Sequence, residues 1–125
     1  MTASGPGHML AVVQDLMAAS RLAASARALG WTVTFAETRE QFERALRDER
    51  PALVLIGLAA LQLPLAELVA TVRADPAAAR TPVIAFGPHL DLELRQRALA
   101  AGCTAMVGNS RVATDLAGLL RQYVG

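Results

Sequence analysis

The sequence predicts an α/β fold: a doubly wound, five-stranded parallel sheet between two layers of helices, a (βα)5 three-layer sandwich. Short apolar segments alternate with amphipathic segments along the whole chain. Several of the short segments are apolar at successive positions, so strands formed from them need helices on both faces. The connections are short, which favours right-handed crossovers between neighbouring parallel strands. A length of 125 residues fits one domain.

The first strand–helix unit is expected to follow a tail. Residues 1–8 include two Gly and one Pro and are expected to be flexible, which leaves 9–125 as the domain. An apolar run too short for a helix predicts a strand at 9–13. Apolar residues at helical spacing then predict a helix over 16–29, with Asp15 as its N-cap.

The second unit is expected after Gly30, which stands where a helix C-terminus favours glycine. Residues 31–35 (WTVTF) are mostly β-branched or aromatic and predict the second strand. Thr38 and Gln41 have the spacing of a capping box, so a helix is expected from there to about Asp48.

The third unit is predicted by the segment 52–56 (ALVLI), which is apolar on both faces and typical of a buried central strand. A helix is expected over 65–73, where Asp75 and Pro76 end it. Residues 82–86 (PVIAF) predict the fourth strand.

The chain is expected to finish with a helix over 91–102, a short strand at 104–107 and a last helix. The last helix has four residues at i, i+3, i+4 and i+7 that predict one apolar face: Leu116, Leu119, Leu120 and Tyr123. In such a sheet, a ligand site is expected at the carboxyl ends of the strands.

The composition excludes many kinds of site. All twelve basic residues are Arg, so no lysine is available for a phosphate-binding loop or a Schiff base. Cys103 is the only cysteine, and it is expected to be a small buried hydrophobe. His8 and His89 are too few for a histidine-rich metal site, and a lone His is rarely a catalytic base. We therefore expect no metal, no other cofactor and no enzyme.

The charge and hydropathy restrict partners and location. A formal net charge of +1 provides no basic field, so no nucleic-acid partner is expected. The first eight residues lack the pattern of a secretory signal. Residues 53–72 are strongly apolar but include Gln62, Pro64 and Glu67, which indicate a strand, a loop and an amphipathic helix rather than a membrane span. We expect a cytoplasmic protein without membrane contact.

Four phrases, in their order and spacing, resemble the response-regulator receiver domain, the CheY-like phosphoacceptor module of two-component signalling. They are AVVQD in the first strand, PALVLIG in the third, VRADPAAARTPVIAF into the fourth and ALAAGCTAMV into the fifth. The resemblance extends from Met9 to Val124 and implies a flavodoxin-like, CheY-like fold.

The same resemblance implies a phosphorylation site that has degenerated. In working receivers an aspartate after the third strand takes a phosphoryl group from a histidine kinase, assisted by Mg²⁺, a hydroxyl and a lysine. The matching positions here are Gln14, Asp15, Gly57, Gly87 and Asn109. Gly57 stands at the phosphoacceptor position and has no side chain to phosphorylate. Aspartyl phosphorylation at this site is therefore not expected.

Each residue of this degenerate pocket also has a structural interpretation. Asp15 is better explained as a helix cap than as a remaining metal ligand. Gln14 either forms a hydrogen bond across the pocket or lies at its rim. Gly57 and Gly87 either open backbone amides to a ligand or reflect the loss of side chains no longer needed. Ser110, in a turn with the preceding residue, is expected to cap the last helix.

The loop after the third strand is apolar where a working receiver has a wet, acidic pocket. Its apolar residues are Leu58, Ala59, Ala60, Leu61, Leu63 and Leu65. They are expected to fold inward and plug the vacated pocket, rather than to remain exposed as a contact patch.

These observations predict a degenerate, or pseudo-, receiver domain that signals through protein–protein interaction without aspartyl phosphorylation. The resemblance implies a kinase or regulator as partner, or a homodimer, through the surface of helix 4, strand 5 and helix 5. The charged residues expected on that surface are Glu93, Arg95, Arg97, Arg111, Asp115 and Arg121. The alternative is a small-molecule sensor whose site is formed by Gly57, Gly87 and the leucine-rich loop.

Overall fold

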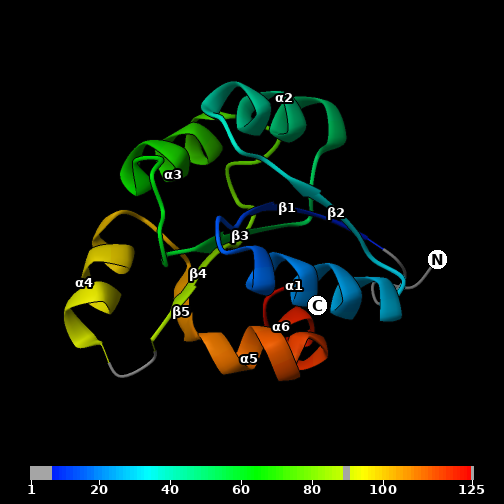
Figure 1. Ribbon diagram of the computed structural model, residues 1–125. Coiled ribbons are helices and arrows are strands. Elements are labelled where there is room, and N and C mark those ends of the chain that lie inside the picture. Colours follow the sequence, from blue (N-terminus) through cyan, green and yellow to red (C-terminus); the bar gives the residue numbers. More distant parts are fainter. Residues whose placement is uncertain (1–6, 89–90, 125) are drawn as a thin grey trace.

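The computed structural model describes residues 7–88 and 91–124, and it contains one five-stranded sheet between two layers of helices (Figure 1). The strands are β1 (His8–Val12), β2 (Thr32–Phe35), β3 (Leu53–Gly57), β4 (Val83–Gly87) and β5 (Ala105–Gly108). All pairings are parallel, in the order β2-β1-β3-β4-β5. The predicted doubly wound parallel sheet is confirmed.

The helices of the described residues begin and end largely where the sequence predicts. They are α1 (Leu16–Ala28), α2 (Arg39–Glu49), α3 (Leu65–Ala74), α4 (Leu92–Ala100), α5 (Asn109–Thr114) and α6 (Leu116–Tyr123). Thr38 caps α2 by accepting a hydrogen bond from the Gln41 backbone amide at 3.1 Å. Gly30 and Gly102 have positive φ angles of 78° and 100°, the conformation that favours glycine after a helix.

The last helix differs from the prediction because it is two helices. α5 begins at Asn109, directly after β5, so the expected turn with Ser110 as a cap is wrong. Asp115 interrupts the helix, and its Oδ1 accepts a hydrogen bond from the Gly118 amide at 3.2 Å. A carboxylate is a strong N-cap, and this one starts α6 with the predicted apolar face towards the sheet.

The sheet also begins one residue earlier than expected. His8 belongs to β1 and not to the tail, because it pairs with Thr32 of β2. The His8 ring contacts the Thr32 hydroxyl at 2.6 Å through Nδ1 and the Glu49 carboxylate of α2 at 2.5 Å through Nε2. Of the expected tail, residues 1–6 lie outside the described residues, as does His89.

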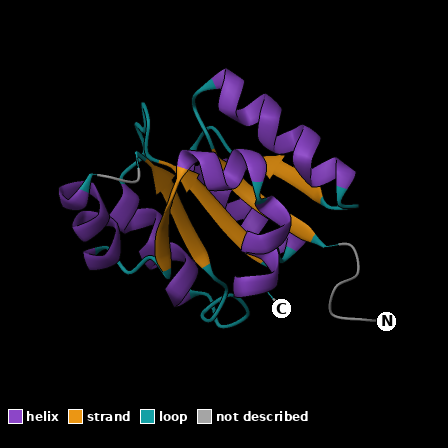
Figure 2. Ribbon diagram, turned by 90° about the horizontal axis from the view of Figure 1, so that it is seen from below, coloured by secondary structure: helices purple, strands orange, loops and turns teal. Residues whose placement is uncertain are grey.

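Helices cover the two faces of the sheet, as Figure 2 shows from below, and an apolar cluster lies between the strands and the helices on each face. Successive strand residues face opposite sides. In β3, Leu53 and Leu55 pack with α1, α5 and α6, whereas Val54 and Ile56 pack with α2, α3 and α4. All four are completely buried. The expected burial of this strand on both faces is confirmed, and its alternation decides which way residue 57 points.

No helix in the described part of the chain combines the length and the hydropathy needed to cross a bilayer. The segment 53–72 divides into β3, a loop and the first part of α3, as the sequence predicts.

Cys103 is buried, as expected for a small hydrophobe. Burial raises the pKa of its thiol from 9.0 to about 11, against a smaller lowering by the nearby Arg73 guanidinium. Between these two values the unfolded chain has released this proton and the folded chain has kept it. The thiol therefore makes the free energy of unfolding fall as pH rises from about 9 to about 11, and it adds no slope below that window.

Replacing the thiol tests this pH dependence. We expect the wild type to lose on the order of 1 kcal/mol more stability than Cys103→Ala between about pH 8 and about pH 10.5. Urea unfolding at both pH values measures the two slopes. Equal slopes would contradict the assignment, whatever constant cost the substitution adds.

Candidate functional site

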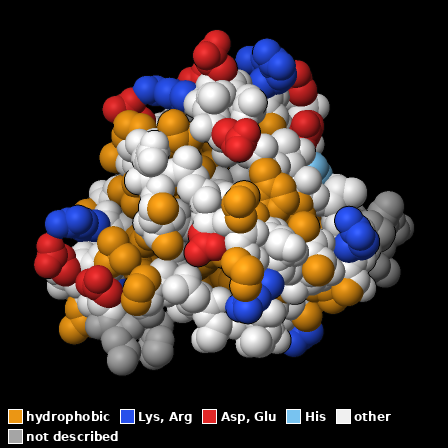
Figure 3. Space-filling model, in the orientation of Figure 1, with side chains coloured by type: hydrophobic (Ala, Val, Ile, Leu, Met, Phe, Trp, Pro, Cys, Tyr) orange, Lys and Arg blue, Asp and Glu red, His pale blue; other side chains and the backbone are white. Residues whose placement is uncertain are grey.

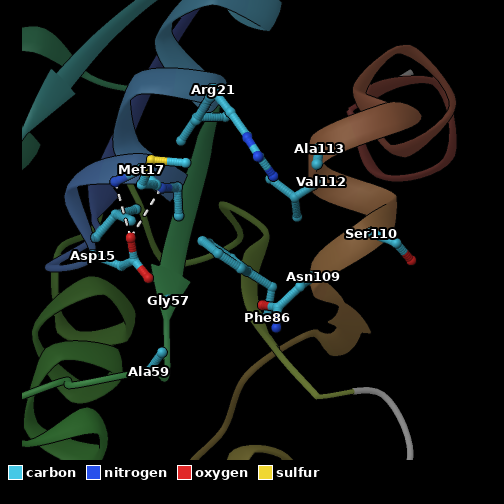
Figure 4. Close-up of a pocket in the computed structure, with 13 residues that line it drawn as sticks. Asp15, Met17, Arg21, Gly57, Ala59, Phe86, Asn109, Ser110, Val112 and Ala113 are labelled. Carbon is cyan, nitrogen blue, oxygen red and sulfur yellow. Dashed lines mark hydrogen bonds between the residues drawn. The ribbon is translucent and has the colours of Figure 1, made fainter.

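A pocket of about 270 Å³ lies at the carboxyl ends of the central strands, between α1 and α5 (Figure 4). Its lining residues come from both helices and from the ends of β1, β3 and β4: Val13, Asp15, Met17, Ala18, Arg21, Leu22, Gly57, Ala59, Phe86, Asn109, Ser110, Val112 and Ala113. Three of the five residues predicted for the degenerate pocket, Asp15, Gly57 and Asn109, line it together.

Gly57 lies against an aromatic ring. Gly57 and Phe86 are register partners in β3 and β4, so their side-chain positions share one face of the sheet. A Cβ atom added at Gly57 would lie 3.0 Å from Cζ of Phe86 and 3.3 Å from its Cε2. Phe86 is itself 4% exposed. The ring thus takes the space from which a side chain at position 57 would extend.

Asp15 caps α1. Its Oδ1 accepts hydrogen bonds from the backbone amides of Met17 at 2.9 Å and Ala18 at 3.2 Å, drawn as dashed lines in Figure 4. The N-cap interpretation is confirmed. The first turn of the helix fixes the direction of this carboxylate.

Gln14 points towards the loop after β3. Its Oε1 accepts a hydrogen bond from the Gln62 backbone amide at 2.6 Å, and the side chain does not line the pocket. Gln14 thus forms a hydrogen bond, but the bond does not cross the pocket that Asp15 and Gly57 line. It ties the end of β1 to the β3–α3 loop.

The donor set does not fit magnesium. Mg²⁺ is usually held by one or two carboxylates together with waters and phosphate oxygens. Asp15 is the pocket's only carboxylate, and one of its oxygens already binds two helix amides. Across residues 7–88 and 91–124, no three His, Cys, Asp or Glu side chains gather as a metal site. We therefore assign no chemical step to a metal here.

Gly87 does not belong to this pocket. A Cβ atom at Gly87 would face Leu94 and Met106 at 3.4 Å and Leu58 at 3.6 Å, all on the other side of the sheet. The expectation that Gly57 and Gly87 open one site is wrong. The two residues lie on different strands one register position apart, and the alternation of side chains turns them to opposite faces.

The leucine-rich loop folds inward, but it fills a different space from the one expected. Its partly buried leucines pack against the cluster beneath α2, α3 and α4: Leu58, Leu61, Leu63 and Leu65. Of this loop only Ala59 lines the pocket, and Ala60 is exposed with a positive φ of 57°. The leucines therefore leave the α1–α5 pocket open instead of plugging it.

Arg21 is a pocket residue that the sequence patterns did not indicate. This exposed α1 side chain lines the pocket, and in Figure 4 it reaches across towards Val112 of α5. No ion pair joins it to any residue that the structure describes. Arg21 lines the pocket because α5 packs beside α1, and no spacing in the sequence predicts that packing.

The first turn of α1, beside the pocket, exposes two large apolar side chains. Leu16 is 84% exposed and Met17 is 65% exposed, both in the first turn of α1. Figure 3 shows hydrophobic side chains across the middle of this face, among acidic and basic ones, with further charged side chains over α2 and α4.

The second predicted surface lies on α4, β5, α5 and the start of α6. Glu93 pairs with Arg97 at 2.8 Å within α4, and Arg111 approaches Asp115 at 3.8 Å. Two of the predicted cations, Arg95 and Arg111, line a shallow groove together with Met106, Val107 and Gly108. The remaining one, Arg121, is exposed on α6.

Two leucines add an apolar component to this surface. Leu92 and Leu99 are 69% and 45% exposed on α4, seven residues apart and thus on one helix face.

Solved structures of receiver domains are similar to this chain. The receiver domain of the sensor histidine kinase PA1611 from Pseudomonas aeruginosa, solved with magnesium in its active-site cleft, gives a TM-score of 0.82 at 21% identity, over 97% of this chain and 99% of that one. The CheY-like protein TadZ from the same organism gives 0.73 at 26% identity, over 95% and 94%.

The chemotaxis response regulator CheY4 of Vibrio cholerae gives a TM-score of 0.74 at 20% identity, over 92% of this chain and 97% of that one. No family model and no curated protein sequence matches the chain. The strand order, the helices on both faces and these similarities agree. The chain has the flavodoxin-like, CheY-like fold of the response-regulator receiver domain.

Proposed function

We propose that this chain is a degenerate receiver domain of a two-component or phosphorelay-type pathway, and that it acts by protein–protein contact without aspartyl phosphorylation. The observation that carries the proposal is the Phe86 ring packed against Gly57. The position where the resemblance places a phosphoacceptor has no carboxylate, and a Cβ atom there would press against that ring at 3.0 Å. The domain then serves as a cytoplasmic binding module and not as an enzyme.

The partner surface in this proposal is the face of α4, β5 and α5. Exposed leucines on α4 supply the apolar area that a protein interface buries at its centre. Arginines beside them supply charge-assisted contacts, and Arg95 forms no ion pair with a described residue. A kinase, a regulator or a second copy of the chain is the partner that this surface fits.

One experiment with two readouts tests the proposal. The protein is incubated with Mg²⁺ and acetyl phosphate beside a receiver that carries the aspartate. We expect the intact mass and the sedimentation behaviour of this chain to stay unchanged, because no side chain at position 57 can form the acyl phosphate. A stable phosphoryl adduct mapped to Asp15 would contradict the proposal.

The partner surface is tested in the same preparation and by capture from the native host. We expect the double variant Leu92→Gln with Leu99→Gln to weaken self-association or partner capture by about tenfold or more. The matched control is Leu29→Gln, an exposed leucine at the end of α1. Equal loss in both variants would contradict a role for the α4 face.

A second candidate function, small-molecule sensing, is favoured by the α1–α5 pocket itself. Its wall is mostly apolar with a few polar groups, the composition common to ligand pockets. We propose the space between α1 and α5 as this site in place of the leucine-rich loop, because the leucines of that loop pack on the other face of the sheet.

A further inference from the structure

We propose that the α1–α5 pocket binds a small organic acid, with its carboxylate on Arg21 and its short aromatic or aliphatic body over Phe86. The inference rests on the second candidate function, sensing, and specifies the chemical class of the ligand.

The apolar part of the pocket sets the body of the ligand. Phe86 and Gly57 line it, together with Val13 after β1, Leu22 of α1 and Val112 of α5. Pockets for drug-sized ligands run from about 300 to 1,000 Å³, and this one has about 270 Å³. A single ring or a short aliphatic chain therefore suits a pocket of this size.

The charged side chains of the pocket set the head group. Arg21 is its only cationic residue and Asp15 its only anionic one. The Asp15 carboxylate already accepts two backbone hydrogen bonds from α1. Arg21 has no ion-pair partner in the described parts of the chain. The first-turn amides of α1 thus hold the Asp15 carboxylate, whereas the Arg21 guanidinium has no charged partner among the described residues and is the group of this pocket that would bind an anion.

The shape of the arginine head group favours a carboxylate. A guanidinium presents parallel N–H donors that match the two oxygens of a carboxylate, and such pairs are among the stronger hydrogen bonds in proteins. Figure 4 shows the Arg21 side chain stretched from α1 towards Val112, along the open side of the pocket. A carboxylate bound there would have its apolar body directed towards Phe86.

The polar groups on the opposite wall complete the site. Asn109 and Ser110 are exposed at the start of α5 and line the same pocket. Each carries a hydrogen-bonding side chain that can select a second polar group on the ligand. They carry no charge, so they do not alter the preference for an acid.

A titration followed by amide NMR tests the inference. The probes are phenylacetate, its neutral analogue phenylacetamide and the cation phenethylamine. We expect the acid to shift the backbone amide signals of Gly57, Ala59 and Ser110, and to bind about tenfold more tightly than the amide. The amine is expected to bind most weakly, because Arg21 repels it.

Two arginine variants of α1 separate the head-group contact from general charge. Arg21→Gln is expected to lower the affinity for phenylacetate to that for phenylacetamide, with the amide's own affinity unchanged. Arg27→Gln removes another exposed α1 arginine outside the pocket lining, and it is expected to leave both affinities unchanged.

The outcomes separate two questions: whether the ligand is an acid, and whether the pocket binds a small molecule at all. Equal binding of acid and amide, or an acid preference that survives Arg21→Gln, overturns the carboxylate assignment while the pocket remains a candidate sensor. No shift at the pocket amides with any probe overturns the sensing function together with this inference. Neither result bears on the protein-contact proposal, which the sedimentation experiment tests separately.

Discussion

Gly57→Asp is expected to give a less stable protein that is still not phosphorylated by acetyl phosphate. The new Cβ would lie 3.0 Å from Cζ of Phe86, so the ring must move before any carboxylate can be placed. Overpacking of this kind costs about 1–3 kcal/mol. The lack of a second carboxylate and of a lysine would leave the new aspartate without the groups that assist phosphoryl transfer. Urea unfolding and the intact mass measure both effects.

A double-mutant cycle with Phe86→Leu shows whether the ring is the cause. Phe86→Leu alone is expected to destabilise, because a buried ring loses its contacts. In that background the added cost of Gly57→Asp is expected to fall by about 1 kcal/mol or more, since the two residues touch. If the stability losses of Gly57→Asp and Phe86→Leu simply add, the contact between the two residues is not the reason for the loss in Gly57→Asp. A phosphoryl adduct on the aspartate introduced by Gly57→Asp would exclude the second half of the prediction.

Arg73→Ala is expected to lower the free energy of unfolding by about 2–4 kcal/mol. Nη1 of Arg73 donates to the carbonyls of Ala79 at 3.1 Å and Thr81 at 2.7 Å, and Nη2 lies 3.3 Å from the carbonyl of Gly102 and 3.2 Å from the hydroxyl of Thr104. One half-buried guanidinium thus joins the end of α3 to the segments that lead into β4 and β5. Chemical denaturation measures the loss.

Two further variants show whether the planar shape of the Arg73 guanidinium or its charge accounts for the stabilisation. Arg73→Lys is expected to recover less than half of the loss, because a single ammonium cannot reach all these acceptors at once. Arg80→Ala changes an exposed arginine of the same α3–β4 connection and is expected to stay within about 0.5 kcal/mol of the wild type. A lysine variant as stable as the wild type would show that the fork geometry is unimportant.

Part of the candidate site could be predicted because its residues directly follow strands. Asp15, Gly57 and Asn109 stand at the ends of β1, β3 and β5, and parallel strands bring such positions together. The same reasoning predicts Gly87 beside them, but side-chain alternation turns it to the other face. No sequence pattern predicts Arg21, because it lies in the second turn of a helix where no motif marks it.

Phe86 shows the limit of sequence reasoning most clearly. The sequence predicts it to be a strand residue, yet its contact with Gly57 depends on the register between β3 and β4. A shift of one residue would turn its ring to the other layer. The packing of both faces of the sheet against their helices fixes that register. No single segment of the sequence includes the residues of both faces.

The sequence by itself determined which segments form strands and helices, that the central strand is buried on both faces, and that no carboxylate follows it at position 57. These are properties of residue type and local spacing, which the chain carries before it folds. Only the tertiary structure decided that Phe86 covers Gly57, that Gly87 faces away, and that an open pocket remains beneath Arg21. Those features depend on register and on how α1 packs beside α5, and both are set when all the layers close together.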